Sequence, residues 1–322
     1  MQIELNENQR KASLHKDGPA LVLAVPGAGK TTVIIQRTHN LINEYNINPN
    51  EILSITFSRA SARDMKNRYY AMFDNNKNES IKFSTIHSFS YTILREFAFR
   101  KNIKYTLIEG QNKQINKNKL LKKIYYDLNG EYITEENLEN IINSIGFIKN
   151  MMYTIDDYLA INKTDIKNFK QIYNYYENYK KKNFLIDFDD MLSITYKALK
   201  EDKYLLNKYR NKYSYIQVDE GQDTSKLQME IIKTIAAPKN NLFIVADDDQ
   251  SIYGFRGAFP KGLLNFNKDF YNAKLFFMEE NFRSTKNIVN VSNKFIKENT
   301  LRYDKNLYTK NKSQFGWLIN QL

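Results

Sequence analysis

Short apolar runs, each followed by polar or turn residues, recur along the chain. They are rich in β-branched or aromatic residues and have the length of buried strands. The runs lie at residues 21–23, 52–57, 81–86, 215–218, 242–246 and 274–278. In most cases a helical pattern follows, such as Val33, Arg37 and Leu41 after the first run. Strands that alternate with helices predict an α/β fold with a parallel sheet, in which ligands bind beyond the carboxyl ends of the strands.

The alternation stops between about residues 97 and 213, where long stretches rich in Lys, Asn and Tyr carry a helical pattern. We predict that this region is a helical subdomain inserted into the α/β domain. Within it, residues 184–192 fit a helix N-cap followed by an amphipathic helix, and we assign them no chemistry. The expected α/β domain therefore comprises residues 1–96 and 214–279.

The residues that follow the first predicted strand indicate a phosphate-binding loop. Residues 24–31 read Ala-Val-Pro-Gly-Ala-Gly-Lys-Thr, a pattern in which backbone N–H groups and a helix N-terminus surround phosphate oxygens. Lys30 would reach the β- and γ-phosphates, and Thr31 would place its hydroxyl on Mg²⁺. Ala24 stands where the strict pattern has its first Gly, and a plain strand-to-helix turn is the alternative. The expected nucleotide-binding residues of the loop are Ala24, Val25, Pro26, Gly27, Ala28, Gly29, Lys30, Thr31 and Thr32.

Two later strands end in acidic residues. Asp219 and Glu220 directly follow the strand at 215–218; Asp219 would hold Mg²⁺ and Glu220 would polarise the water that attacks the γ-phosphate. An ordinary helix cap is a sufficient alternative for Asp223. The strand at 242–246 runs into three consecutive acids, which repel one another unless a cation or an amide network lies nearby. From its position after these acids, Gln250 would donate to the γ-phosphate.

The composition of the chain is consistent with a polyanionic binding partner. The chain has a net charge of +12, a pI near 9.4 and 14% aromatic residues, a combination expected of proteins that contact nucleic acid and stack on its bases. An AT-rich coding sequence, with its heavy use of Asn, Lys, Ile and Tyr, is the alternative explanation. The absence of cysteine excludes disulfides, Cys-based zinc sites and a thiol nucleophile. With no leader pattern and no apolar run near the roughly 20 residues of a membrane helix, we expect a soluble cytoplasmic protein.

Seven blocks resemble, in order, the motifs of superfamily 1 DNA helicases of the UvrD/Rep/PcrA type. They lie at 5–9 (Q motif), 24–31 (phosphate loop), 55–60 (motif Ia), 85–89 (motif Ib), 218–223 (motif II), 247–258 (motif III) and 280–285 (motif IV). The resemblance implies a RecA-like P-loop NTPase sheet with an inserted helical subdomain. It further implies that residues 280–322 begin an incomplete second RecA-like domain.

The resemblance also implies roles for single residues. Gln9 would read the adenine of ATP, and Phe282 would stack on it where the family more often has Tyr. Thr31 and Asp219 would bind the metal. The implied catalytic and phosphate-contacting residues are Lys30, Glu220, Gln250 and Arg283.

Contacts to single-stranded DNA are implied for residues of motifs Ia, Ib and III. Without the resemblance, Phe57 and Phe255 would fit a protein core, and His87 would fit a structural imidazole. Phe255 replaces a Trp that is common in the family, so the stacking face is smaller. The implied DNA-contacting residues are Phe57, Thr85, His87, Tyr253, Phe255 and Arg256.

The family pattern extends further than this sequence, since nothing like motifs V and VI follows Arg283. Those motifs complete a second RecA-like domain whose arginine closes over the γ-phosphate, and such an arginine contributes on the order of 10³ to 10⁵ in rate. Residues 283–312 hold eight Lys or Arg and two acids, which fits a solvated face. We therefore expect the 322 residues alone to bind ATP better than they hydrolyse it, and to unwind little.

The expected function is that of an ATP-dependent 3′–5′ DNA helicase, with ATP and Mg²⁺ as cofactors. Its partner would be single-stranded DNA or a single-strand/duplex junction. One alternative is an ATP- and DNA-binding module without motor activity, either regulatory or dependent on a chain that supplies the second motor domain. A weaker alternative is a small-molecule phosphotransferase with a phosphate loop, which would turn over ATP regardless of DNA.

Overall fold

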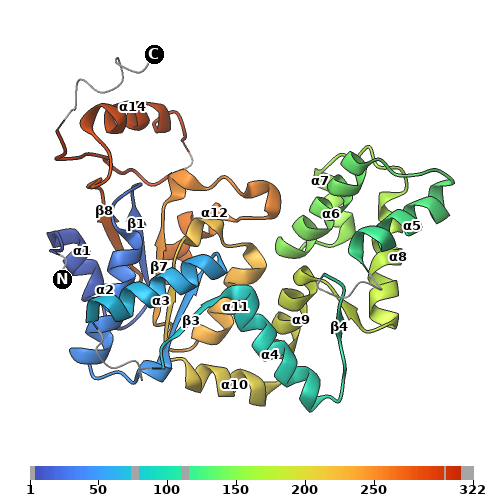
Figure 1. Ribbon diagram of the computed structural model, residues 1–322, viewed down its shortest axis with the longest axis horizontal. Helices are drawn as coiled ribbons and strands as arrows, with labels where there is room; N and C mark the ends of the chain where they lie inside the picture. Colours follow the sequence, from blue (N-terminus) through green and yellow to red (C-terminus); the bar gives the residue numbers. More distant parts are fainter. Residues whose placement is uncertain (1–3, 74–79, 110–115, 301, 313–322) are drawn as a thin grey trace.

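The computed structural model describes residues 4–73, 80–109, 116–300 and 302–312, without the side chain of Arg256. Its centre is one parallel sheet (Figure 1) with strand order β3-β2-β6-β7-β1-β8. The strands are β1 (Ala20–Ala24), β2 (Ile52–Thr56), β3 (Lys82–Thr85), β6 (Tyr215–Val218), β7 (Leu242–Ala246) and β8 (Lys274–Met278). Each lies within one residue of its predicted bounds. The predicted parallel α/β sheet is therefore confirmed.

Helices cover both faces of the sheet, because alternate side chains of a buried strand point to opposite sides. In β1, Ala20 and Val22 pack under one helical layer, whereas Leu21 and Leu23 pack under the other. The first layer contains α1 (Glu7–Ser13), α2 (Lys30–Asn43) and α3 (Arg59–Phe73). The second contains α4 (Ile86–Arg100), α9 (Phe188–Glu201), α10 (Lys203–Lys212), α11 (Lys226–Ala236), α12 (Pro260–Leu264) and α13 (Phe266–Asp269). A 3-10 turn, η1 (Pro49–Glu51), precedes β2.

A second body of helices has its own core, which includes Leu121, Ile141, Ile172 and Tyr176. It is built from α5 (Lys117–Asn129), α6 (Glu135–Asn150), α7 (Ile155–Ile161) and α8 (Phe169–Lys182), with the two-stranded sheet β4 (Thr106–Leu107) and β5 (Leu185–Ile186). Figure 1 shows α5 to α8 gathered away from the main sheet, with α9 between the two bodies. The helical region at 97–213 therefore serves two cores, since the buried side chains of α9 and α10 join that of the sheet.

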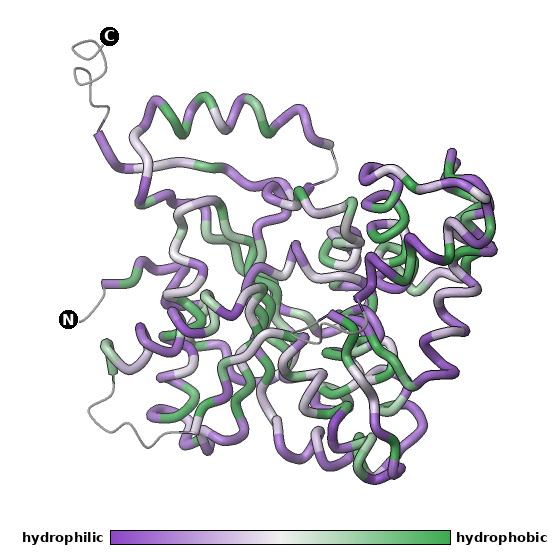
Figure 2. Tube along the Cα trace, turned by 45° about the vertical axis from the view of Figure 1, so that its right-hand side comes forward, coloured by the Kyte–Doolittle hydropathy of each residue, from purple (hydrophilic) through white to green (hydrophobic). Residues whose placement is uncertain are grey.

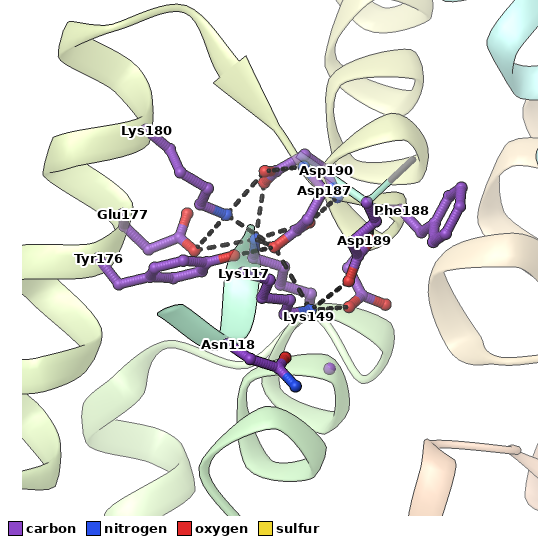
Figure 3. Close-up of polar contacts among 12 residues, drawn as sticks. Lys117, Asn118, Lys149, Tyr176, Glu177, Lys180, Asp187, Phe188, Asp189 and Asp190 are labelled. Carbon is purple, nitrogen blue, oxygen red and sulfur yellow. Dashed lines mark hydrogen bonds and ion pairs between the residues drawn. The ribbon is translucent and has the colours of Figure 1, made fainter. Parts of the chain in front are cut away.

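The helical body meets α9 through a buried network of charges (Figure 3). Asp187 is the N-cap of α9 and forms a capping box with Asp190, which confirms the capped amphipathic helix predicted at 184–192. Lys180 Nζ lies 2.9 Å from Asp187 Oδ2 and 2.7 Å from Asp190 Oδ2, and Lys149 Nζ lies 2.6 Å from Asp190 Oδ1. With Lys117, three lysines contact five carboxylates: Glu109, Glu177, Asp187, Asp189 and Asp190.

Burial alone would raise the pKa of Asp187, but Lys149, Lys180 and Lys117 together hold it well below its usual range. We call this set of side chains the ionic joint. Buried charges of this kind are tolerated only where they are paired and hydrogen-bonded. The ionic joint therefore fixes how α5, α6 and α8 sit against α9.

The C-terminal part packs beside β8. Glu280 forms a parallel β-bridge with Tyr308, and α14 (Lys286–Ile296) lies beyond it. Figure 2 shows alternating hydrophilic and hydrophobic stretches along α14, and its Val289 joins the core under α1, α2 and α3. Residues 313–322 of the expected second domain lie outside the described residues. In the part of the chain that the structure describes, every helix is too short or too polar to cross a membrane.

Candidate nucleotide-binding and nucleic-acid sites

The loop between β1 and α2 has the backbone shape of a phosphate-binding loop. Gly27 and Gly29 have φ angles of 72° and 82°, a region that favours glycine. A Cβ atom at Gly27 would lie 2.9 Å from Asn281 Nδ2, and one at Gly29 would lie 2.9 Å from Gln9 Nε2. Ala24 is the buried last residue of β1. Its side chain is accommodated there, which explains why this position needs no glycine.

Lys30 and the acids after β6 meet at this loop. Lys30 Nζ lies 3.0 Å from Glu220 Oε2, and the Thr31 hydroxyl donates to Asp219 Oδ2 over 3.2 Å. The contact spans almost 190 positions of sequence, yet β1 and β6 are separated by β7 alone in the sheet. Because all three strands are parallel, their carboxyl ends lie at one edge. The structure therefore brings together the residues that the sequence proposed for phosphate and metal.

A cavity of about 260 Å³ opens at this edge. Its lining is polar and rich in cationic groups, as a polyphosphate would require. The lining residues are Gly27, Ala28, Gly29, Lys30, Thr31, Thr32, Arg68, Glu220, Gln250 and Arg283. Ala24, Val25 and Pro26 of the predicted set are not in this lining, and Ala24 and Val25 are buried.

Arg68 was not predicted from the sequence. It lies on α3, and its Nη2 donates to Thr32 Oγ1 over 3.1 Å. Arg59, Arg63 and Lys66 share the same helix, so the sequence pattern does not distinguish Arg68 from its neighbours. Only the packing of α3 beside α2 places this one guanidinium at the cavity.

The two other predicted nucleotide residues flank the loop. Gln9 is 5% exposed; its Nε2 donates to Ala28 O over 2.9 Å, and its Oε1 accepts from Asn6 N. Phe282 is 48% exposed, and its N–H donates to Gly27 O over 3.1 Å. Both residues thus touch the phosphate loop, and Phe282 presents an open aromatic face beside it.

The carboxylates at the cavity have perturbed acidity. Burial, and then the charge of Glu220, raises the pKa of Asp219 to about 6, against the opposing charge of Lys30. Burial and Glu220 likewise raise the pKa of Asp223 to about 6. A hydroxyl and a carboxylate oxygen are ligands that Mg²⁺ accepts. Thr31 and Asp219 could therefore hold Mg²⁺, whose charge would relieve the repulsion.

Glu220 adopts a left-handed backbone conformation, with φ 53° and ψ 47°. For a residue other than glycine this costs roughly 1–2 kcal/mol, and such strain concentrates at functional sites. The side-chain Nε2 of Gln222 holds Glu220 by donating to its Oε2 over 2.8 Å, and Gln222 Oε1 accepts from Asp247 N over 2.9 Å. Gln222 therefore links the acids of motif II to motif III.

The helix cap that the sequence allows at residues 223–225 is present and is formed by Ser225. Asp223 ends the 3-10 turn η2 (Gly221–Asp223), and Ser225 forms a capping box with Gln228 at the start of α11.

The three consecutive acids, Asp247 to Asp249, do have a cation beside them, as their repulsion predicts. It is Lys305, assisted by Arg302. The expectation of a solvated face for residues 283–312 is wrong for these two side chains, which are 0% and 8% exposed. The signal that could have found them was the unexplained acidic run itself.

Aromatic side chains form an exposed surface next to the cavity. Phe57 is 49% exposed and stacks on Tyr253, with ring centroids 5.5 Å apart and planes at 17°. Phe255 follows, 59% exposed, with its ring 6.3 Å from that of Tyr253. The alternative of core residues is therefore wrong for Phe57 and Phe255. We call these three residues the aromatic ledge.

Thr85 and His87, two further predicted DNA contacts, lie near Phe57: Thr85 pairs with Thr56 in the sheet, and His87 shares a cavity with Phe57. Thr85 is buried, and its hydroxyl caps α4 by accepting from Ser88 N. His87 and Phe57 line a small cavity of about 120 Å³ that also reaches Asp219 and Glu220. Burial lowers the pKa of His87. The side chain of Arg256 lies outside the described part of the structure.

Comparison with known proteins gives a consistent result. The family model described as the UvrD/REP helicase N-terminal domain matches residues 5–271. The chain is 36% identical over 324 residues to the probable DNA helicase II homolog of Mycoplasma capricolum subsp. capricolum, covering 96% of this chain and 43% of that protein. It is also 36% identical over 312 residues to the ATP-dependent DNA helicase PcrA of Staphylococcus epidermidis, covering 95% of this chain and 42% of that protein. The chain thus spans less than half the length of these relatives.

Proposed function

Because this chain belongs to the UvrD/REP helicase N-terminal domain family, we propose that it acts as the ATP-binding half of an ATP-dependent DNA helicase. The observation that carries the proposal is the meeting of Lys30, Thr31, Asp219 and Glu220 at one cavity. A phosphate loop, a metal-holding pair and a carboxylate that can orient water are the parts that ATP hydrolysis requires.

In this proposal each polar group has a defined task. The backbone of the loop and Lys30 hold the phosphates, while Arg68 and Arg283 place further positive charge at the same cavity. Mg²⁺, held by Thr31 and Asp219, would neutralise charge on the phosphate oxygens when bound. Release of Lys30 to the phosphates would free Glu220, now paired with it at 3.0 Å, to accept a proton from water.

We further propose that the aromatic ledge stacks on the bases of single-stranded DNA. Stacking of a base on an aromatic ring contributes about 1–3 kcal/mol and tolerates any sequence. The small cavity shared by Phe57, His87, Asp219 and Glu220 would let DNA on the ledge influence the acids. Movement in the 3′–5′ direction, and the need for a second motor domain, are proposals that rest on the family alone.

The proposed domain division follows the same family arrangement, with residues 1–96 and 214–279 as the ATP-binding domain and 97–213 as the inserted subdomain. Residues 280–322 would begin the second motor domain. We propose a cytoplasmic location, since a protein that acts on DNA and hydrolyses ATP is expected there.

The test is steady-state ATP hydrolysis by the 322-residue chain, with and without single-stranded oligo-dT. We expect weak turnover that DNA stimulates and that Glu220→Gln lowers by roughly 10²- to 10⁴-fold, the contribution of a general base. Glu298→Gln, at an exposed acid on the C-terminal part, is the matched control and should leave turnover unchanged. Lys30→Ala should remove most of the affinity for ATP.

The other outcomes separate the alternatives. Binding of both ATP and DNA without turnover would indicate a binding module. Turnover that DNA leaves unchanged would indicate a phosphotransferase. A chain that binds no magnesium nucleotide would refute the proposal.

A further inference from the structure

The acidic turn of motif III is built around one buried lysine. Asp247, Asp248 and Asp249 all contact Lys305 Nζ, with distances of 3.0 Å to Asp247 Oδ1 and 3.1 Å to Asp249 Oδ2. Arg302 binds Asp249 through two hydrogen bonds, from Nε over 2.7 Å and from Nη2 over 2.9 Å. The three carboxylates thus converge on cations that come from more than fifty residues downstream.

Burying these charged side chains costs free energy, so their presence needs an explanation. Lys305 is 0% exposed, and a buried ammonium loses its hydration. Burial alone would lower the pKa of Lys305, but the three carboxylates raise it above its ordinary value, so the lysine stays charged. Replacing such an ionic group by apolar side chains is often neutral for stability. Its presence is therefore better explained by the geometry that it imposes than by stability.

That geometry includes Gln250. Asp247 is the N-cap of the 3-10 turn η3 (Asp248–Gln250), and Gln250 N–H donates to Asp247 O over 2.9 Å. Asp247 is held by Lys305 through its side chain and by Gln222 through its backbone, since Gln222 Oε1 accepts from Asp247 N. The side chain of Gln250 lines the nucleotide cavity. After the turn, the Ser251 hydroxyl donates to Gln222 O over 3.3 Å. The position of the Gln250 amide therefore depends on a turn that is held before and after it.

The segment that supplies the cations also reaches motif IV. Asn281 N–H donates to Tyr308 O over 2.8 Å, and the Thr309 hydroxyl donates to Asn281 O over 2.6 Å. Asn281 in turn accepts from Arg283 N through its Oδ1 over 2.9 Å. Residues 302–309, which we call the strap, thus connect the turn that carries Gln250 with the turn that carries Arg283.

We propose that Lys305, assisted by Arg302, is a positioning residue for recognition of the γ-phosphate. The strap would hold Gln250 and Arg283 at the separation that a triphosphate requires, whereas the phosphate loop alone suffices for a diphosphate. The inference rests on the proposed function, since it assumes that the cavity binds ATP. It assigns a role in the ATP site to a segment that lies beyond the residues 5–271 matched by the family model.

The experiment compares the affinities of the 322-residue chain for ATPγS and ADP, each with Mg²⁺, by isothermal titration calorimetry. The preference for ATPγS over ADP is the readout, because a general loss of structure would lower both affinities together. In Lys305→Met we expect this preference to fall by about tenfold, the lower limit for losing one hydrogen bond from Gln250 to a charged phosphate. The affinity for ADP should stay within about twofold of the wild type. Lys297→Met removes the same charge from an exposed site on the C-terminal part and should keep the preference.

Arg302→Met is the second variant, and it decides the test should Lys305→Met fail to fold. It removes the paired bonds to Asp249 but leaves Lys305 in place, and we expect a smaller loss of preference in the same direction. A folded variant that retains the full preference would overturn the inference, as would a wild type that binds both nucleotides equally. A wild type that binds neither nucleotide would instead refute the proposed function.

Discussion

Lys180→Met tests how much the ionic joint contributes to stability. Methionine has nearly the length of lysine but removes a charge that lies within 3.0 Å of Asp187, Asp190 and Glu177. Asp187, which is 0% exposed, would keep Lys149 at 3.5 Å and the hydroxyl of Tyr176 at 3.0 Å. Breaking a buried pair costs about 3–5 kcal/mol. Because partial compensation remains, we expect a loss near the lower limit, about 3 kcal/mol.

The free energy of unfolding is measured by urea titration, with circular dichroism as the signal. Lys181→Met is the matched control, since Lys181 is the exposed neighbour on the same helix; its effect should stay within about 0.5 kcal/mol. A carboxylate whose pKa is lowered by folding stabilises the folded state at pH values above its pKa in the unfolded chain. This stabilisation is lost as the pH falls through its pKa in the folded protein. The difference between Lys180→Met and wild type should therefore shrink as Asp187 becomes protonated.

A loss in Lys180→Met no larger than in Lys181→Met would refute the reasoning, since it would show that the buried carboxylates do not depend on this lysine. Adding Asp187→Asn to Lys180→Met provides a further check. It removes the carboxylate charge that has lost Lys180, and part of the lost stability should return.

Three further predictions concern the sites. Phe57→Ala should weaken binding of fluorescent oligo-dT by about 1–3 kcal/mol without changing ADP affinity; unchanged anisotropy would exclude Phe57 from the interface. In Gly257→Ala, where φ is 85° and the new Cβ would lie 2.8 Å from Asn150 Cβ, strain of about 1–3 kcal/mol should lower Tm by several degrees, and an unchanged melting curve would contradict this. The pKa of Asp219 is raised to about 6, so below that pH protons compete with Mg²⁺ for its carboxylate. The Mg²⁺-dependent affinity for ADP should therefore fall about tenfold per pH unit below pH 6. Asp223→Asn should retain that profile, whereas a flat profile would show that Asp219 does not bind the metal.

The sheet, and the meeting of Lys30 and Thr31 with Glu220 and Asp219, could be predicted because they follow from local signals. Apolar runs indicate strands, and parallel strands place whatever follows them at one edge of a sheet. The roles assigned to these residues stay predictions. The structure adds the side chains, including Arg68 and Lys305, that come from distant parts of the sequence and lie at this edge of the sheet.

The sequence does not single out those residues, because their partners are set by packing over long distances. In a sequence with many basic residues, nothing shows which of them becomes buried. Lys305 and Lys310 differ only in the residues that pack around them. The same holds for α9 and α10: an amphipathic pattern shows that one helix face is apolar, but not which core that face joins. Charge runs that repel one another, as at 247–249, were the one available clue to a buried counter-charge.

The order of strands has a consequence for how the chain is made. β1 carries the phosphate loop, yet its two neighbours are β7 and β8, more than two hundred residues later. During synthesis from the N-terminus this apolar strand would emerge from the ribosome long before either neighbour exists, and such unpaired strands are prone to aggregate. Shielding of this strand by a chaperone until residue 278 has been translated would then raise the yield of folded protein.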